Sequence, residues 1–282
     1  MKLFISSDIE GTAGIAHWDE TTPDKSGPLY QYFREQMSRE VAAACRGARE
    51  AGASLVLVKD AHDSGRNLIP LELPRGVLVS RDWSGALGSM ADALDGDFTD
   101  PATGTRAGAF DAFACTGYHS PAYDKGNPLA HTMNGTLYEI FVNGSRASEF
   151  MINSLYASRL GVPVIFLSGD RALCESAKAW IPGLTTVAVS EGRGGASISL
   201  HPLDAVERVH DGMRSAVKGF ARSGKECLAP LADSYEVIIR YTQHAKALKN
   251  SQYPGAKRVD EKTIRFEASD WMDVMTAFRF IL

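Results

Sequence analysis

The chain has 282 residues, of which 44% are hydrophobic, and a formal net charge of −4. A chain of this length can bury a full hydrophobic core and commonly divides into two packed units. Its acidic and basic residues are interspersed, which argues against nucleic-acid partners and a membrane-binding patch. No apolar run approaches the roughly 18 residues of a membrane span, and the apolar stretch before Asp8 is too short for a signal peptide.

The cysteines indicate a reducing environment. Four are present, and none shows the C-x-x-C spacing of a redox or zinc motif. Three of them lie in segments that the sequence predicts as helix or strand interior. We therefore expect reduced, mostly buried thiols and a cytoplasmic protein.

Apolar strand-like runs alternate with helical stretches through the first two thirds of the chain. The pattern predicts strands at 2–6, 55–59, 77–80, 112–115 and 162–167, and helices at 29–51, 149–160 and 171–180. This alternation favours an α/β fold with a mostly parallel sheet and flanking helices in the N-terminal part. Residues 138–142, followed by Asn143-Gly144, instead predict a hairpin arm with a type I′ turn.

A glycine cluster at 192–195 suggests a seam between two units. The sequence thus predicts a metal-binding catalytic α/β domain at 1–192 and a smaller α+β domain at 193–282. The second unit is expected to contain helices at 203–222 and 271–280 and strands at 235–241 and 263–268. Residues 92–106, rich in Asp, Gly and Thr, predict a surface excursion.

Two carboxylates stand at the end of the first predicted strand. Asp8 and Glu10 are two residues apart, so on an extended backbone their side chains leave on the same face. Crowded carboxylates repel each other, and a nearby cation offsets that repulsion. Gly11 then lets the chain turn away without steric cost. The motif indicates metal chemistry.

Other chemistry-bearing side chains follow later strands. His62 follows the 55–59 strand, His119 follows the 112–115 strand, His131 lies in the next loop, and Glu149 opens a helix. Taken singly, each has a plainer explanation, such as a hydrogen-bonded loop histidine or a first-turn helix acid. In open α/β sheets, however, ligands collect at the carboxyl ends of the strands. Mixed imidazole and carboxylate ligands suit zinc or another borderline divalent ion.

The charge balance favours two metal ions over one. Asp8, Glu10 and Glu149 contribute −3, and two divalent ions contribute +4, so a bridging hydroxide brings the cluster to zero. A single dication with the same ligands leaves −1, which is a poor setting for generating a nucleophile.

In these residues the chain resembles the DppA-type D-aminopeptidases, a family of zinc metallopeptidases. The matching stretches are Ser7-Asp8-Ile9-Glu10-Gly11, Asp60-Ala61-His62, Gly117-Tyr118-His119, His131-Thr132-Met133 and Glu149, in the family's order and at similar spacing. The resemblance covers most of the chain and weakens after about residue 190.

The resemblance implies a role for each matched position. Asp8 would bridge two zinc ions, Glu10 and His62 would complete the first, and His119 and Glu149 the second. His131 would be the catalytic residue that is not a ligand. The family's assembly is a ring-shaped homodecamer with active sites facing an internal channel, which implies short peptides as substrates.

The implied function is a di-zinc aminopeptidase that removes the N-terminal residue of short, D-aminoacyl peptides by attack of a metal-bridging hydroxide. His131 would act as general base, general acid or oxyanion donor, and Asp60 or Asp63 would hold the His62 ring by its free N–H.

Three alternatives are open from the residues alone. An L-specific aminopeptidase would use the same metal site. A magnesium-dependent phosphohydrolase of haloacid-dehalogenase type has a D-x-D-G-T motif, to which Asp8-Ile9-Glu10-Gly11-Thr12 is close, and Gly169-Asp170 imitates its later acidic motif. That chemistry does not call for three histidines, since magnesium prefers oxygen ligands. A binding module with a decayed site would predict missing ligands.

Overall fold

The protein is built on two sheets. The computed structural model describes residues 1–23 and 27–282. The larger sheet has seven strands in the order β3-β2-β1-β4-β7-β8-β9, and all neighbours are parallel except the β8–β9 pair. Its strands are β1 (Lys2–Ser7), β2 (Leu55–Asp60), β3 (Leu78–Ser80), β4 (Ala112–Tyr118), β7 (Val164–Asp170), β8 (Thr185–Arg193) and β9 (Ala196–Ser199). The expected mostly parallel α/β sheet is confirmed.

The smaller sheet is antiparallel and has five strands in the order β11-β12-β10-β5-β6. Its members are β5 (Leu137–Val142), β6 (Ser145–Arg146), β10 (Tyr235–Tyr241), β11 (Lys257–Arg258) and β12 (Thr263–Ala268). The β5–β6 turn has positive φ at both central residues, 48° at Asn143 and 77° at Gly144, as a type I′ turn requires.

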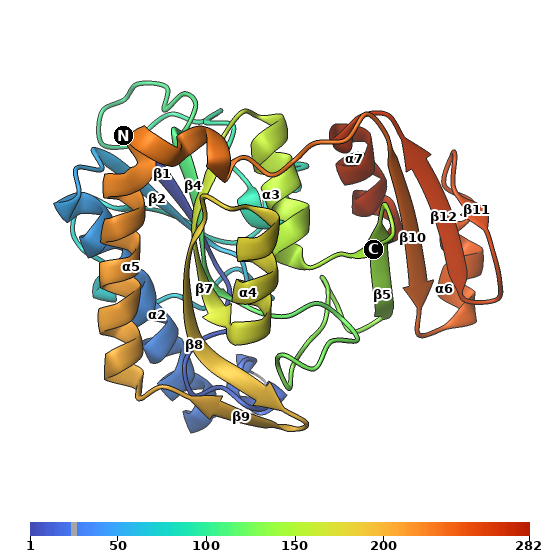
Figure 1. Cartoon of the computed structure of the whole chain (residues 1–282), viewed down its shortest axis with the longest axis horizontal. Coiled ribbons are helices and arrows are strands. Elements are labelled where there is room, and N and C mark those ends of the chain that lie inside the picture. Colours follow the sequence, from blue (N-terminus) through green and yellow to red (C-terminus); the bar gives the residue numbers. More distant parts are fainter. Residues whose placement is uncertain (24–26) are drawn as a thin grey trace.

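Helices cover both faces of the larger sheet (Figure 1). The helices are α2 (Pro28–Glu50), α3 (Glu149–Arg159), α4 (Arg171–Trp180), α5 (Pro202–Ser223), α6 (His244–Asn250) and α7 (Trp271–Ile281), with short 3₁₀ turns at Trp18–Glu20, Pro70–Glu72, Ser89–Ala91 and Gly224–Cys227. Alternate residues of β1 point to opposite faces, as strand geometry dictates. Leu3 and Ile5 pack in the core with α2 and α5, whereas Phe4 packs in the core with α3 and α4.

The smaller sheet lies beyond α3, at the opposite end of the molecule from α5, and α7 packs against α3 and β10 (Figure 1). Trp271 and Phe278 of α7 are buried in the same core as Phe150 of α3. This contact brings the last helix of the chain close to the start of α3, which carries Glu149.

The sheets do not divide the chain at residue 192. The glycine cluster 192–195 spans the end of β8 and the turn into β9, with Gly194 at φ 61°, so the expected seam lies within the larger sheet. Helix α5 packs against α2 and β8 on the larger sheet, and β5 and β6 pair into the smaller one. Sequence patterns are local and do not show which distant strand an edge will pair with, which is why the sheet membership differs from the expected 1–192 and 193–282 division.

Several smaller features also bear on the sequence predictions. Strand β7 begins at Val164, so Pro163 precedes it, and its carbonyl accepts a hydrogen bond from the Phe113 N–H at 2.9 Å. In the 92–106 segment, residues 101–106 are exposed whereas Leu94 is fully buried. All four cysteines are buried thiols. None of the described helices combines the length and apolar character that crossing a membrane requires.

Candidate metal centre

The carboxyl ends of β1, β2 and β4 meet at one edge of the larger sheet. In register, Ser7 is opposite Asp60 of β2 and Thr116 of β4. Asp8 therefore leaves β1 beside the segments that carry His62 and His119. Convergence of parallel strand ends explains why residues more than 100 positions apart share one site.

Two glycines allow the loops after β1 and β4 to approach closely. The Gly11 N–H donates to the Gly117 carbonyl at 2.8 Å, and a Cβ on Gly11 would lie 1.9 Å from the Tyr118 carbonyl oxygen. Gly117 has φ +67°, and a Cβ there would lie 2.2 Å from the Asp8 carbonyl oxygen. Only glycine fits these positions, so the carboxylate pair and His119 are held together by backbone contact.

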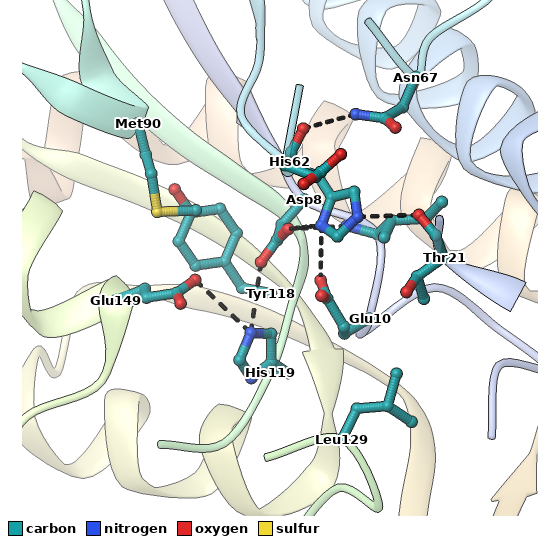
Figure 2. Close-up of polar contacts among 12 residues, drawn as sticks. Asp8, Glu10, Thr21, His62, Asn67, Met90, Tyr118, His119, Leu129 and Glu149 are labelled. Atoms are coloured by element: carbon teal, nitrogen blue, oxygen red, sulfur yellow. Dashed lines mark hydrogen bonds and ion pairs between the residues drawn. The ribbon is translucent and has the colours of Figure 1, made fainter. Parts of the chain in front are cut away.

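His62 faces both carboxylates that follow β1 (Figure 2). Its Nδ1 lies 3.4 Å from Asp8 Oδ1 and 3.2 Å from Glu10 Oε2. The other ring nitrogen, Nε2, lies 2.9 Å from the Thr21 carbonyl oxygen. Since a carbonyl only accepts, Nε2 carries the proton and neutral His62 presents a lone pair at Nδ1.

The expectation that Asp60 or Asp63 holds the His62 ring is therefore wrong. The carboxylate of Asp60 accepts hydrogen bonds from the backbone N–H of Asn67 at 2.6 Å and of Leu68 at 2.7 Å, and from the Asn67 side chain at 2.9 Å. The Asn67 amide in turn donates to the His62 carbonyl at 2.6 Å. Asp60 thus shapes the loop that carries His62, and the ring itself is oriented by Thr21.

His119 has the corresponding arrangement on the other side of Asp8 (Figure 2). Its Nε2 lies 3.5 Å from Asp8 Oδ2 and 3.5 Å from Glu149 Oε2. Its Nδ1 lies 2.9 Å from the Ser120 carbonyl oxygen, so Nδ1 carries the proton and Nε2 faces the carboxylates as a lone pair.

Glu149 is fixed at the first turn of α3. Ser148 is the N-cap residue, and its hydroxyl accepts from the Met151 N–H at 3.0 Å. Glu149 Oε1 accepts from the backbone N–H of Met133 at 2.6 Å, which leaves Oε2 directed at His119. Met133 has φ 66°, a strained conformation for a side-chain-bearing residue, of a kind that clusters at functional sites.

The buried polar atoms of this cluster fit a bound cation. Asp8, Glu10, His62, His119 and Glu149 are each no more than 7% exposed. Within the described residues, Asp8 Oδ2, both carboxylate oxygens of Glu10 and Nε2 of His119 have no hydrogen-bond partner. Leaving buried anionic oxygens unpaired is costly, and metal coordination removes that cost.

The ligand atoms of the described residues form three groups, two of which share Asp8. Asp8, Glu10 and His62 offer atoms within 4.8 Å of one another, and so do Asp8, His119 and Glu149. A further group of the same kind is formed by Glu10, His119 and His131. Carboxylate oxygens and imidazole nitrogens are the donors that zinc takes outside thiolate sites.

The pKa values of the cluster show how strongly it attracts positive charge. Burial, together with the Glu10 charge, raises the pKa of Asp8 well above its usual range. Burial alone would raise the pKa of Glu10 and Glu149, but neighbouring imidazoles outweigh it and hold the Glu149 pKa at about 2. Burial disfavours the imidazolium forms of His62 and His119, yet the carboxylates raise both pKa values well above normal.

Protons on these imidazoles are a poorer geometric fit than metal ions. Charge-assisted N–H···O bonds are about 2.7–2.9 Å long. The His62 and His119 contacts to carboxylates span 3.2–3.5 Å, which leaves the ligand atoms apart rather than bonded to each other. Metal binding would replace those protons with a larger charge.

His131 lies at the rim of the cluster. Its Nε2 is 3.6 Å from Glu149 Oε1, its Nδ1 is 2.9 Å from the Leu129 carbonyl oxygen, and its ring stacks on His119 with centroids 4.3 Å apart. Trp18 packs edge-on against the same ring at 5.1 Å. With 15% of its side chain exposed, His131 is more accessible than His62 or His119.

A cavity of about 250 Å³ opens onto the cluster. Its lining includes Asp8, His62, His131 and Glu149, together with Ala61, Asp63 and Met133 from the sequence motifs. Four further lining residues were not singled out by the sequence: Trp83, Ser89, Met90 and Arg279. No sequence signal marks Trp83 or Arg279, because neither adjoins a motif and each arrives through tertiary packing.

The fold and this cluster together define an α/β metallohydrolase. A family model described as D-aminopeptidase matches residues 1–280, and the chain belongs to that D-aminopeptidase family. The family resemblance expected from the motifs is thus confirmed.

Two comparisons with individual proteins agree. The chain is 28% identical to a D-aminopeptidase of Bacillus subtilis over 282 residues, covering 98% of this chain and 95% of the relative. Its fold is similar to the solved structure of the Zn-dependent D-aminopeptidase DppA from Bacillus subtilis, described as a self-compartmentalizing protease, with a TM-score of 0.84 and 24% identity over 99% of this chain and 95% of that one.

Proposed function

We propose that this protein is a two-zinc aminopeptidase that hydrolyses the N-terminal residue of short peptides, with a preference for D-aminoacyl ends. The observation that carries the proposal is the pair of three-residue ligand groups that share Asp8. Family membership supports the aminopeptidase activity and the D-preference, and the Zn-dependent structural neighbour supports the choice of metal.

In this proposal Asp8 would bridge the two ions. Glu10 and His62 would complete one site, and His119 and Glu149 would complete the other. The two carboxylate oxygens of Asp8 face different histidines, Oδ1 toward His62 and Oδ2 toward His119, as a bridging ligand requires. Three carboxylates leave a charge of −3 in a buried site, which matches two divalent ions better than one.

When bound, the ions supply Lewis-acid polarisation of the scissile carbonyl and activation of the attacking water. The protein contributes their positions. Thr21 and Ser120 fix the ring orientations of His62 and His119 through their carbonyls, and such contacts raise ligand basicity and metal affinity.

His131 is the proposed proton-transfer residue. The hydrogen bond to Leu129 holds the proton on Nδ1, so Nε2 of the neutral ring is free to accept a proton. That atom faces Glu149 and the cavity. Nε2 can take a proton from the attacking water and later deliver it to the leaving amine, whereas donation to an oxyanion requires the protonated ring.

A homo-oligomer is part of the proposal, because the structural neighbour is described as self-compartmentalizing. The ring-shaped decamer is the form that the family resemblance implies. Enclosed active sites would admit short peptides and exclude folded proteins. Four buried thiols support a cytoplasmic location.

The phosphohydrolase alternative is not favoured. Gly169-Asp170 resembles the later acidic motif of that class. The Asp170 carboxylate, however, accepts hydrogen bonds from Ser120 and from the N-terminus of α4, so its oxygens are engaged in holding the fold. The three histidines at the cluster also have no place in a magnesium site.

The deciding experiment compares metal-free, zinc-loaded and magnesium-loaded enzyme on paired D- and L-alanine p-nitroanilides and on p-nitrophenyl phosphate. We expect zinc-dependent release of p-nitroaniline, faster from the D-substrate, with two zinc ions per chain by elemental analysis. Cleavage of the L-substrate alone would overturn the D-preference. Magnesium-dependent phosphate release without anilide hydrolysis would overturn the aminopeptidase.

A further inference from the structure

The cavity over the metal cluster continues away from the metals toward α7. A second cavity of about 200 Å³ adjoins it, because Ser89, Met133 and Arg279 line both. Most other residues of the second cavity are apolar: Leu87, Ile152, Met275, Phe278 and Leu282. A ligand at the metals therefore has an apolar path toward the last helix of the chain.

Arg279 is an exposed cation where the two cavities meet. Within the described parts of the chain, its guanidinium has no recorded hydrogen bond or ion pair. A Cβ on Gly85 would lie 3.6 Å from Arg279 Nη2, which places the guanidinium against the loop between Trp83 and Ser89 that walls the first cavity.

The remaining charge on the cavity wall is acidic or imidazole. The titratable groups that line the first cavity besides Arg279 are Asp8, His62, Asp63, His131 and Glu149. Lys59 lies behind Trp83, but its ammonium is buried, donates to the Asp60 and Asp82 carbonyls, and packs over the Trp83 ring at 4.2 Å. Arg279 is thus the permanent cation available to a ligand among the described lining residues.

We propose that Arg279 binds the terminal α-carboxylate of the substrate, so that the enzyme selects short peptides with a free C-terminus. This rests on the proposed aminopeptidase function. The guanidinium has a planar fork of donors that matches a carboxylate, and charge-assisted pairs of this kind are among the stronger hydrogen bonds.

The position of Arg279 on α7 limits the substrate length. An extended chain advances at most about 3.5 Å per residue, so one cation at a set place beyond the metals pairs with the carboxylate of only one or two peptide lengths. The side chain of the residue after the scissile bond would then occupy the apolar second cavity, between Met133 and Phe278.

A purely structural role for Arg279 makes a different prediction. An arginine in the last turn of a helix interacts favourably with the helix dipole, and its loss then affects every substrate equally through stability. Carboxylate recognition affects only substrates that carry a carboxylate.

The test compares D-alanyl-D-alanine, its C-terminal amide and D-alanine p-nitroanilide in the wild type, Arg279→Gln and Arg279→Lys. In the wild type we expect kcat/KM for the free acid to exceed that for the amide at least tenfold, with the difference in KM. Arg279→Gln removes this preference and leaves amide and anilide hydrolysis within about twofold, and Arg279→Lys restores part of it. Arg265→Gln removes an exposed arginine of β12 that pairs with Glu236 of β10, and this control keeps the wild-type preference.

A binding measurement separates this proposal from the proposed function. An uncleavable alanyl-alanine isostere with a methyleneamino linkage, as acid and as amide, is titrated calorimetrically into zinc-loaded enzyme. Arg279-dependent preference for the acid isostere, combined with no hydrolysis of D-alanyl-D-alanine, its amide or D-alanine p-nitroanilide, would overturn the aminopeptidase and keep the carboxylate site. Equal affinity for acid and amide in the wild type, or an equal loss of all substrates in Arg279→Gln, would overturn the carboxylate site.

Discussion

The carboxylate of Asp170 accepts two hydrogen bonds from Ser120, one from its backbone N–H and one from its hydroxyl, both at 2.6 Å. The Ser120 carbonyl in turn accepts from Nδ1 of His119. Asp170 also caps α4 by accepting from the Leu173 N–H at 2.9 Å. One buried carboxylate at the end of β7 thereby fixes the backbone that orients a proposed metal ligand.

Asp170→Asn should weaken zinc binding about tenfold, because outer-shell partners of metal ligands typically contribute ~10–100-fold to affinity. Asparagine caps helices as well as aspartate, so the α4 cap is retained and the melting temperature should change little. Competition with a chelator measures the affinity. The matched control is Asp270→Asn, at the N-cap of α7, which should bind zinc normally. Wild-type zinc affinity in Asp170→Asn would show that Ser120 is positioned by other contacts.

Asp8→Ala should lose most of both zinc ions and with them the activity, because one carboxylate faces both histidines. Glu10→Gln should retain the ion between His119 and Glu149. Elemental analysis of dialysed protein gives the zinc content. Asp111→Ala, which removes a carboxylate that accepts from Lys2 at the opposite end of β1, serves as the control and should keep two ions. Two zinc ions in Asp8→Ala would exclude the bridging role.

His131→Ala should keep both ions and lose turnover by roughly 10²–10⁴-fold, the usual contribution of a general acid–base group. Zinc content and kcat measured on one preparation separate proton transfer from loss of metal, which matters because His131 stacks on His119. His201→Ala removes a histidine that caps α5 instead, and its kcat should be unchanged. An unaltered kcat in His131→Ala would remove this residue from the mechanism.

Glu40 makes stability fall as pH rises. Burial raises the pKa of this α2 carboxyl from 4.5 to about 7, although Gln36 and the Ala13 N–H donate to it. Above about pH 4.5 the unfolded chain releases this proton, whereas the folded protein keeps it until about pH 7. The free energy of unfolding therefore falls as pH rises from about 4.5 to 7, and the whole loss is present above pH 7.

The cost at pH 8 is roughly 3 kcal/mol, at ~1.4 kcal/mol per tenfold change in proton affinity. Glu40→Gln should remove it, so the variant's melting temperature relative to wild type should rise by about 5 °C between pH 5 and pH 8. Thermal denaturation at several pH values measures the difference. Glu35→Gln, an exposed carboxyl on the same helix, should show no such trend. A pH-independent difference for Glu40→Gln would mean that Glu40 is charged in the folded protein.

The sequence was sufficient for five of the seven strands of the larger sheet and for the set of polar residues at its edge, but it did not predict β8 and β9. Buried strands such as 55–59 are continuous apolar runs, and a βαβ alternation restricts them to parallel pairing with their carboxyl ends together. His62, His119 and Glu149 therefore lie within reach of Asp8, as the strand positions predicted.

Hydrogen-bond partners and the pairing of distant strands were decided by the tertiary structure, because the local sequence pattern does not encode them. Hydrogen-bond partners such as Thr21 and Ser120 act through backbone carbonyls, which every residue has, so no residue type marks them. Strands β5 and β10 pair although they are about 100 residues apart in sequence. The hairpin pattern of 138–142 did not predict this pairing.

What the sequence by itself determined is the catalytic edge of the sheet, because strand periodicity and the residues that follow each strand are properties of short segments. Only the tertiary structure decided the surroundings of that edge. It set the orientation of each imidazole, the hydrogen-bond partners of Asp60 and Asp170, and the position of Arg279 beside the cavity. These depend on how distant segments pack, and packing is set by the whole core at once rather than by any one stretch of chain.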